Sequence, residues 1–138
     1  MTYREYLIQC QIAGWLDKWL APPATWTAIG HGIAYGSTPE ERRERGIRAK
    51  RLGVKPGWPD IVIYHFGLYG LEVKTSTGSP SEAQRMVHAD IRAAGGEVEI
   101  VRSLEQAKDF VRLWRLPVRL RARSTELLME AVERVMRA

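Results

Sequence analysis

The chain has 138 residues, which suits one compact domain that can bury a hydrophobic core without disulfides or metal staples. Its apolar fraction of 45% excludes a disordered chain, and its single cysteine, Cys10, excludes an intrachain disulfide; we expect this thiol to be buried in a helix. The net charge of +5 favours a polyanionic partner such as nucleic acid.

The first part of the chain is predicted to alternate helix, strand and helix. Residues 2–20 carry apolar side chains at spacings of three and four, which is typical of an amphipathic helix. A short strand over residues 25–29 and a glycine-rich loop over residues 30–37 follow. Thr38 precedes a proline, so we expect it to cap a charged helix that ends near Leu52.

The middle of the chain is predicted to form a β-hairpin followed by a helix. Residues 59–66 and 70–75 are typical of strands, and the short FGLYG segment between them fits a hairpin connection. Ser79 and Glu82 are spaced as a capping box, which predicts a helix that starts at the intervening proline and runs to about Ala94.

The last part of the chain is predicted to contain one more strand and two helices. Residues 97–101 alternate apolar and polar side chains, as a strand does. Ser103 with Gln106 predicts a second capping box and a helix to about Trp114, and Ser124 is expected to cap a final helix. This order of elements predicts an α/β fold with a mixed central sheet flanked by helices.

Three charged residues stand among the apolar residues of the predicted hairpin. Strand side chains alternate between faces, so Glu72 and Lys74 share one face while Val73 points the other way. If the two strands pair, Asp60 lies across from the end of the second strand. The alternative is a surface aspartate with an exposed Glu–Lys pair on an edge strand.

Two carboxylates at the edge of a core are costly unless a cation lies between them. Magnesium suits such a site because it prefers a few carboxylate oxygens together with waters and substrate phosphate. The ion lowers the pKa of a bound water and neutralises charge on a phosphoryl group. Lys74 could orient or help deprotonate that water. These residues therefore predict hydrolysis of a phosphodiester.

The same residues carry a resemblance to a known family. The "PD" at 59–60 followed by "EVK" at 72–74 resembles the PD-(D/E)xK nuclease signature. The stretch GVKPGWPDIVI…GLEVKTSTGSPSEAQ is similar to the VRR-NUC branch, which shows G-x-x-x-G-x-P-D, then E-x-K, then G-x-x-S-x-x-Q. The resemblance covers roughly residues 3–114 and implies a restriction-endonuclease-like core over residues 1–116. Residues 117–138 would then be a basic linker and a C-terminal helix.

The resemblance implies a role for each matching residue. Asp60 and Glu72 would hold magnesium, with manganese as a substitute, and the carbonyl of Val73 would add a ligand. Lys74 would serve the attacking water, and Gln84 would orient Lys74 or a DNA phosphate. The matching residues are compatible with either one or two bound metal ions.

Further polar residues are expected near the site. Glu5 matches the glutamate of an E-x-x-x-Q pattern in the family's first helix and would reach the metal directly or through water; the alternative is a solvated helix residue. His31 stands where many relatives have asparagine, and it either contacts DNA or is an ordinary loop histidine. His65 and His88 show no metal-ligand spacing, so no zinc site is expected.

Basic residues provide a candidate DNA-binding surface. Residues 42–51 contain six of them against one acid: Arg42, Arg43, Arg45, Arg48, Lys50 and Arg51. They either contact phosphates or form a solvated helix. Arg119, Arg121 and Arg123 form a second basic patch. Trp58 is expected in the core, with stacking on a base as the alternative.

The leading hypothesis is a metal-dependent DNA endonuclease, similar to a Holliday-junction resolvase, that acts in phage or mobile-element replication, recombination or repair. The sequence contains no recognition-helix motif, which favours selectivity for DNA structure. One alternative is a DNA-binding module on a nuclease-like fold that does not cleave. Another is an unrelated structural protein with a coincidental match.

The resemblance also favours a homodimer with two active sites. The predicted C-terminal helix has an apolar stripe that packs on its own domain or on a second copy: Leu127, Leu128, Ala131, Val132 and Val135. No apolar run approaches the ~20 residues that span a bilayer, and the N-terminus lacks the pattern of a secretory signal. We therefore expect a cytoplasmic protein of a bacterium or phage-infected host, without an organic cofactor.

Overall fold

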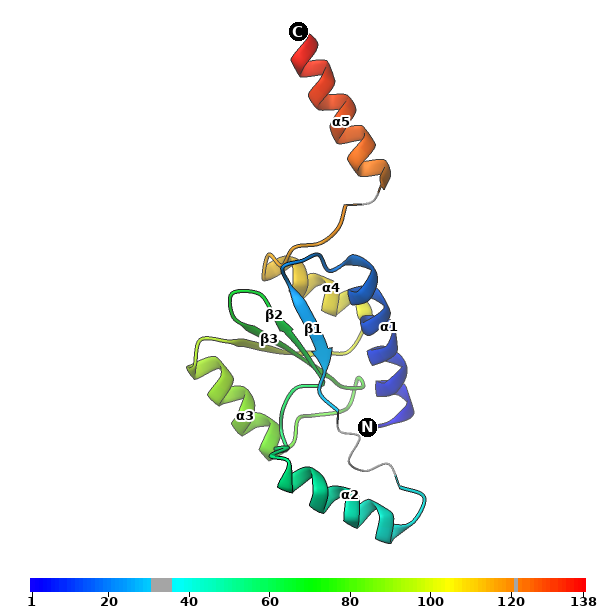
Figure 1. Cartoon of the computed structure of the whole chain (residues 1–138), viewed down its shortest axis with the longest axis vertical. Helices are drawn as coiled ribbons and strands as arrows, with labels where there is room; N and C mark the ends of the chain where they lie inside the picture. Colours follow the sequence, from blue (N-terminus) through cyan, green and yellow to red (C-terminus); the bar gives the residue numbers. More distant parts are fainter. Residues whose placement is uncertain (31–35, 121) are drawn as a thin grey trace.

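Helices surround a single sheet in a mixed α/β arrangement (Figure 1). The computed structural model describes residues 1–30, 36–120 and 122–138. The elements of these ranges are α1 (Tyr3–Trp19), β1 (Thr25–Ala28), α2 (Pro39–Arg51), β2 (Ile61–Tyr64), β3 (Leu68–Val73), α3 (Glu82–Ala93), β4 (Glu97–Val101), α4 (Leu104–Leu113) and α5 (Ala122–Arg137).

The strands of the described ranges form one four-stranded mixed sheet in the order β1-β2-β3-β4. β1 pairs antiparallel with β2, and β2 pairs antiparallel with β3, which confirms the predicted hairpin. The His65 N–H donates to the Gly67 carbonyl at 2.9 Å and closes the hairpin turn. β3 and β4 run parallel, because the chain crosses back through α3 before it enters β4.

The hydrophobic core lies between one face of the sheet and the helices α1 and α4. Its largest fully buried members are Ile12, Leu16, Ile61, Ile63, Leu71, Val73, Val101 and Val111. α3 lies on the other side of the sheet (Figure 1). Because strand side chains alternate, a residue between two core positions of β3, such as Glu72, points toward α3.

The orientation of α1 overturns one expectation. Cys10 is exposed, whereas a buried thiol was expected. α1 turns Ile12 and Leu16 into the core, and residue 10 lies two positions from Ile12, which is about 200° around the helix. The cysteine therefore lies on the face of α1 that points away from the core.

The start of α3 differs from the prediction by two residues. Ser81, and not Ser79, is the N-cap. The Ser81 hydroxyl accepts from the Gln84 N–H at 3.2 Å, and the Gln84 side-chain oxygen accepts from the Ser81 N–H at 2.8 Å. Both serines have a residue suited to a capping box three positions later. The capping box that forms is the one with Gln84, whose side chain also donates to Glu72.

The caps of the last two helices also differ in part. Ser103 caps α4 as expected, but the Gln106 side chain accepts from the N–H of Arg102 instead of that of Ser103. α5 begins at Ala122, so Ser124 lies inside the helix and not before its first residue. Alanine and arginine are good helix formers, which explains a start before the serine.

The segment after α4 is tied to the end of α1. The Ala21 N–H donates to the Pro117 carbonyl at 2.9 Å, and Leu20 forms an isolated antiparallel bridge with Val118. The division of the chain at residue 116 stays a prediction. α5 extends away from the sheet and the other helices (Figure 1). None of the helices in the described ranges combines the length and the apolar character that a bilayer span requires.

Candidate active site

The hairpin register brings Asp60 and Glu72 to the same edge of the sheet. Because Ile61 pairs with Leu71 in an antiparallel register, Asp60 and Glu72 lie opposite one another. Asp60 is 3% exposed, and its Oδ2 accepts a hydrogen bond from the Val73 N–H at 2.7 Å. This placement agrees with the sequence-based expectation that Asp60 lies across from the end of the second strand.

A glycine in β3 lets the chain before Asp60 lie close against the sheet. A Cβ added at Gly70 would lie 2.7 Å from the Cγ of Pro59, well inside contact distance. Pro59 is fully buried, and the Ile29 N–H donates to the carbonyl of Asp60 at 2.8 Å. The backbone of Asp60 is therefore held from two sides, which limits where its carboxylate can point.

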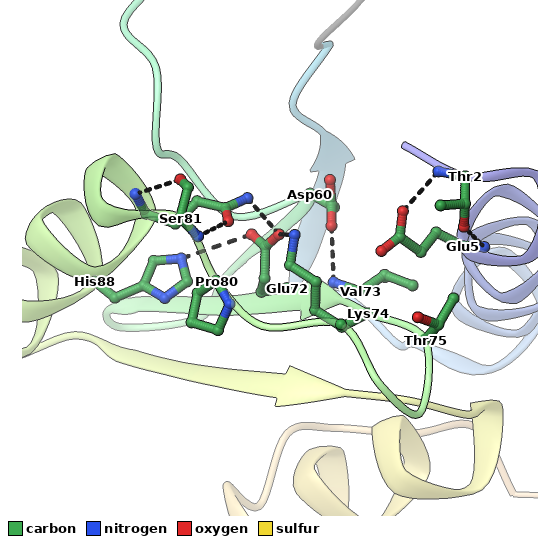
Figure 2. Close-up of polar contacts among 12 residues, drawn as sticks. Thr2, Glu5, Asp60, Glu72, Val73, Lys74, Thr75, Pro80, Ser81 and His88 are labelled. Carbon is green, nitrogen blue, oxygen red and sulfur yellow. Dashed lines mark hydrogen bonds and ion pairs between the residues drawn. The ribbon is translucent and has the colours of Figure 1, made fainter.

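Glu72 is 1% exposed and lies at the centre of the site (Figure 2). Its Oε1 accepts a hydrogen bond from the Gln84 Nε2 at 2.6 Å and lies 3.1 Å from the Lys74 Nζ. Its Oε2 lies 3.6 Å from the His88 Nε2. Because Glu72 is buried, the alternative of an exposed Glu–Lys pair is wrong.

His88 is a residue of the site that sequence reasoning missed. It follows Gln84 by four residues on α3, so both side chains lie on the helix face that is turned toward Glu72. The signal that could have found it is this spacing on the helix after the E-x-K motif.

The surroundings of His88 keep its imidazole neutral at neutral pH. Burial lowers its pKa below the ordinary value, and the positive charges of Arg92 and Lys74 lower it further, against the opposing effect of Asp60. Among the residues that the structure describes, its Nε2 has no hydrogen-bond partner. The imidazole therefore contacts Glu72 as a neutral dipole.

Lys74 lies one residue beyond β3, and β4 holds its backbone in place. Its N–H donates to the Val101 carbonyl at 3.0 Å, which extends the parallel ladder. Arg102 directs one guanidinium nitrogen to the carbonyls of Thr75 and Gly78, the latter at 2.8 Å. The guanidinium thus fixes the turn that follows Lys74.

Glu5 is buried on α1, so the solvated helix residue considered as an alternative is wrong. It belongs to a capping box: its Oε2 accepts from the Thr2 N–H at 2.7 Å, and the Thr2 hydroxyl accepts from the Glu5 N–H at 3.2 Å. Figure 2 shows Glu5 on the opposite side of Asp60 from Glu72. Its expected contact with a metal stays a prediction.

Asp60 and Glu72 are the candidate metal ligands of the site. No group of three His, Cys, Asp or Glu side chains within residues 1–30, 36–120 and 122–138 is arranged to hold a metal ion. Asp60 and Glu72 still offer two buried carboxylates at one sheet edge. Magnesium commonly takes one or two carboxylates and fills its other positions with water and phosphate, so this pair fits that ion. The carbonyl of Val73 as a ligand stays a prediction.

The basic helix α2 lies in the same half of the molecule as the site (Figure 1). All six basic side chains of residues 42–51 are exposed. Downstream of α2, Gly57 adopts a positive φ of 92°, and a Cβ there would lie 2.4 Å from the Ala83 carbonyl oxygen. This close approach holds the segment after α2 against the first turn of α3, the helix that carries Gln84.

Trp58 and Arg119 are the remaining candidate residues whose side chains the structure describes. Trp58 is half-buried, and its role stays open. Arg119 is exposed at the far end of α1, where its N–H donates to the Trp19 carbonyl at 2.7 Å. His31, Arg121 and the side chain of Arg123 lie outside the described part of the structure.

No protein-family model, curated protein or solved structure matches the chain.

Proposed function

We propose that the protein is a magnesium-dependent DNA endonuclease with a restriction-endonuclease-like core, similar to the VRR-NUC branch of the PD-(D/E)xK nucleases. One observation carries the proposal. Asp60, Glu72 and Lys74 come together at one buried sheet edge, where Asp60 binds the strand that carries Glu72 and Lys74. A solvated surface cluster needs no such burial, whereas metal-assisted hydrolysis requires carboxylates held in one place.

Each residue of the site would have its own role in the hydrolysis. Asp60 and Glu72 would hold the ion, with the Val73 carbonyl as a further ligand and manganese as a substitute. When bound, the ion supplies an acidified water and neutralises charge on the phosphoryl group. The ammonium of Lys74, 3.1 Å from Glu72, is placed to orient that water or a phosphate oxygen. Gln84 holds the Glu72 carboxylate in position through its amide N–H.

The surface around the site suggests how DNA would bind. The exposed basic side chains of α2 would contact phosphates, which positions a duplex without reading its sequence. This favours selectivity for DNA structure, as in a junction resolvase of phage or bacterial origin acting in the cytoplasm. A homodimer would supply two active sites for two opposed strands.

The test is cleavage of a labelled four-way junction beside a linear duplex of the same sequence. Reactions contain magnesium, manganese or chelator, and Lys74→Ala runs in parallel with the parent protein. We expect cleavage that needs the metal and falls at least 100-fold in Lys74→Ala, because general acid–base and orienting groups typically contribute about that much. Thermal unfolding of both proteins controls for loss of fold.

The ratio of junction to duplex cleavage identifies the preferred DNA structure. Equal cleavage by Lys74→Ala and the parent protein would contradict the assignment. Absence of cleavage in both metals, with binding that weakens as salt rises, would instead support a module that binds DNA without cutting it.

A further inference from the structure

A hollow of about 240 Å³ lies at the C-terminal end of α1, away from the candidate active site. Its lining is aromatic and cationic: Trp15, Trp19, Lys108, Arg112, Val118 and Arg119. Glu5 and Trp19 are separated by 14 residues of α1, or roughly 21 Å along the helix axis. The hollow and the site therefore lie at opposite ends of α1.

Backbone hydrogen bonds build the wall of this hollow. The Arg119 N–H donates to the Trp19 carbonyl at 2.7 Å, and the Ala21 N–H donates to the Pro117 carbonyl at 2.9 Å. These bonds hold residues 117–119 across the end of α1, while α4 supplies Lys108 and Arg112. The fold therefore fixes the backbone of the segment that carries Val118 and Arg119.

The two tryptophans have different surroundings. Trp15 packs against the hydrophobic core, whereas Trp19 is half-buried and lies outside the core cluster. The Lys18 Nζ lies 5.2 Å from the centre of the Trp19 ring. Trp15 thus belongs to the core packing, whereas Trp19 lies outside the core cluster and lines the hollow.

The charge around the hollow is positive. Lys108 pairs with Glu105 at 2.9 Å and Arg112 pairs with Asp109 at 3.0 Å. Such surface pairs between residues three apart contribute little and are readily exchanged. Lys18 and Arg119 add two further cations, so cations exceed the paired acids at this end of α1. An aromatic ring within a basic hollow matches a ligand that has both a flat ring and a phosphate.

We propose that this hollow binds single-stranded nucleic acid, with an unpaired base against Trp19 and the adjoining phosphates against Arg119 and Arg112. A base can stack on an indole only where it is not paired within a duplex, and cations neutralise the backbone beside it. The inference deepens the proposed function and rests on it for its biological meaning. It assigns the nuclease a substrate with an unpaired strand, such as a flap or splayed arm, beside the duplex to be cut.

The experiment measures binding and not cleavage. Full-length Lys74→Ala protein, in chelator, is titrated against fluorescent single-stranded oligothymidine and a duplex of equal length, with anisotropy as the readout. Trp19→Ala in this background should weaken single-strand binding roughly tenfold, the loss of one base stack. Duplex affinity should stay within about twofold of the Lys74→Ala parent.

Matched variants separate stacking and charge from loss of fold. Trp19→Phe should recover most of the single-strand affinity, since phenylalanine keeps an aromatic face. Arg119→Gln should lower affinity and reduce the slope of log affinity against log salt by about one. Arg115→Gln removes one exposed arginine outside the hollow and should leave single-strand binding unchanged. Thermal unfolding is measured for every variant.

Failure of this inference can be distinguished from failure of the proposed function. Unchanged single-strand affinity in Trp19→Ala would overturn the hollow as a binding site, even if the parent protein cleaves DNA. An equal loss of single-strand and duplex affinity would overturn its preference for unpaired bases. Trp19-dependent binding by a protein that cuts no substrate in either metal would support the hollow and contradict the nuclease.

Discussion

At the scale of single residues, Gln84 has two separate tasks. Its side-chain oxygen accepts the Ser81 N–H and completes the cap of α3, while its nitrogen donates to Glu72 at 2.6 Å. A helix cap thus orients an amide toward the candidate metal ligand. The two tasks can be separated experimentally because they use different atoms of one side chain.

Gln84→Glu should keep the cap and lose the donor. A carboxylate accepts the Ser81 N–H as well as an amide does, but it would face Glu72 with a like charge. We expect the cleavage rate in magnesium to fall about 10- to 100-fold while thermal stability changes little. Ser81→Ala is the matched control, with about 1 kcal/mol of lost stability and near-normal cleavage. A fully active Gln84→Glu protein would contradict this role.

Arg102 acts on the site through the chain that follows Lys74. Its guanidinium contacts the carbonyls of both Thr75 and Gly78, which lie 27 and 24 residues earlier in sequence. It is a positioning residue, since its contacts are with this turn. A lysine could reach one of the two carbonyls but cannot present two N–H groups in a fixed plane.

We expect Arg102→Ala to lower kcat roughly tenfold or more with KM changed less than about twofold, because small displacements of a catalytic group are costly. Arg102→Lys should recover part of the loss. Steady-state cleavage in magnesium measures both constants. A loss confined to KM would mean that Arg102 binds DNA and does not position Lys74.

At the scale of elements, the β2–β3 hairpin is what assembles the two carboxylates. Pro59 packs closely on Gly70 of this hairpin, where any Cβ would collide with the proline ring. Gly67, in the turn of the same hairpin, has open space around the position of a Cβ. The hairpin therefore contains one glycine that packing requires and one that it does not.

Gly70→Ala should move Pro59 and with it Asp60. We expect a stability loss of about 1–3 kcal/mol, typical of overpacking a well-filled site, together with a clear loss of cleavage. Gly67→Ala is the control and should change both far less, since nothing lies within 4 Å of its added methyl group. Urea unfolding and a cleavage assay measure the two effects. Similar results for both variants would contradict the role of the contact.

At the scale of the whole molecule, α5 extends away from the sheet and the other helices (Figure 1). Its apolar side chains are each more than half exposed: Leu127, Leu128, Met129, Val132, Val135 and Met136. A 16-residue helix is marginal in water when nothing covers it. Pairing with a second copy would cover the stripe.

We expect the protein to be a dimer in solution through α5. Val132→Glu should convert it to a monomer, because it places a charge in the middle of the paired stripe. Glu130→Gln lies two positions away, about 200° around the helix, and should leave the dimer intact. Light scattering after size exclusion measures the mass. A parent protein that is already a monomer would contradict this pairing.

Much of the local structure follows from the sequence alone. The helices and strands appear near their expected positions, because apolar periodicity, capping residues and a short hairpin connection act within a few residues of each other. The shared face of Glu72 and Lys74 follows from the alternation of one strand, and the position of Asp60 follows from the hairpin. These parts of the site were predictable because they depend on short-range geometry.

The tertiary structure decided the rest. Burial of Glu5 and the approach of His88 to Glu72 arise only when α1 and α3 are placed beside the sheet. The contact of Arg102 with the turn after Lys74 requires the parallel pairing of β3 and β4 across a helical crossover. Such contacts join residues far apart in sequence, so no local sequence pattern predicts them. The chain by itself determined which residues carry charge at the sheet edge, whereas long-range packing determined what surrounds them.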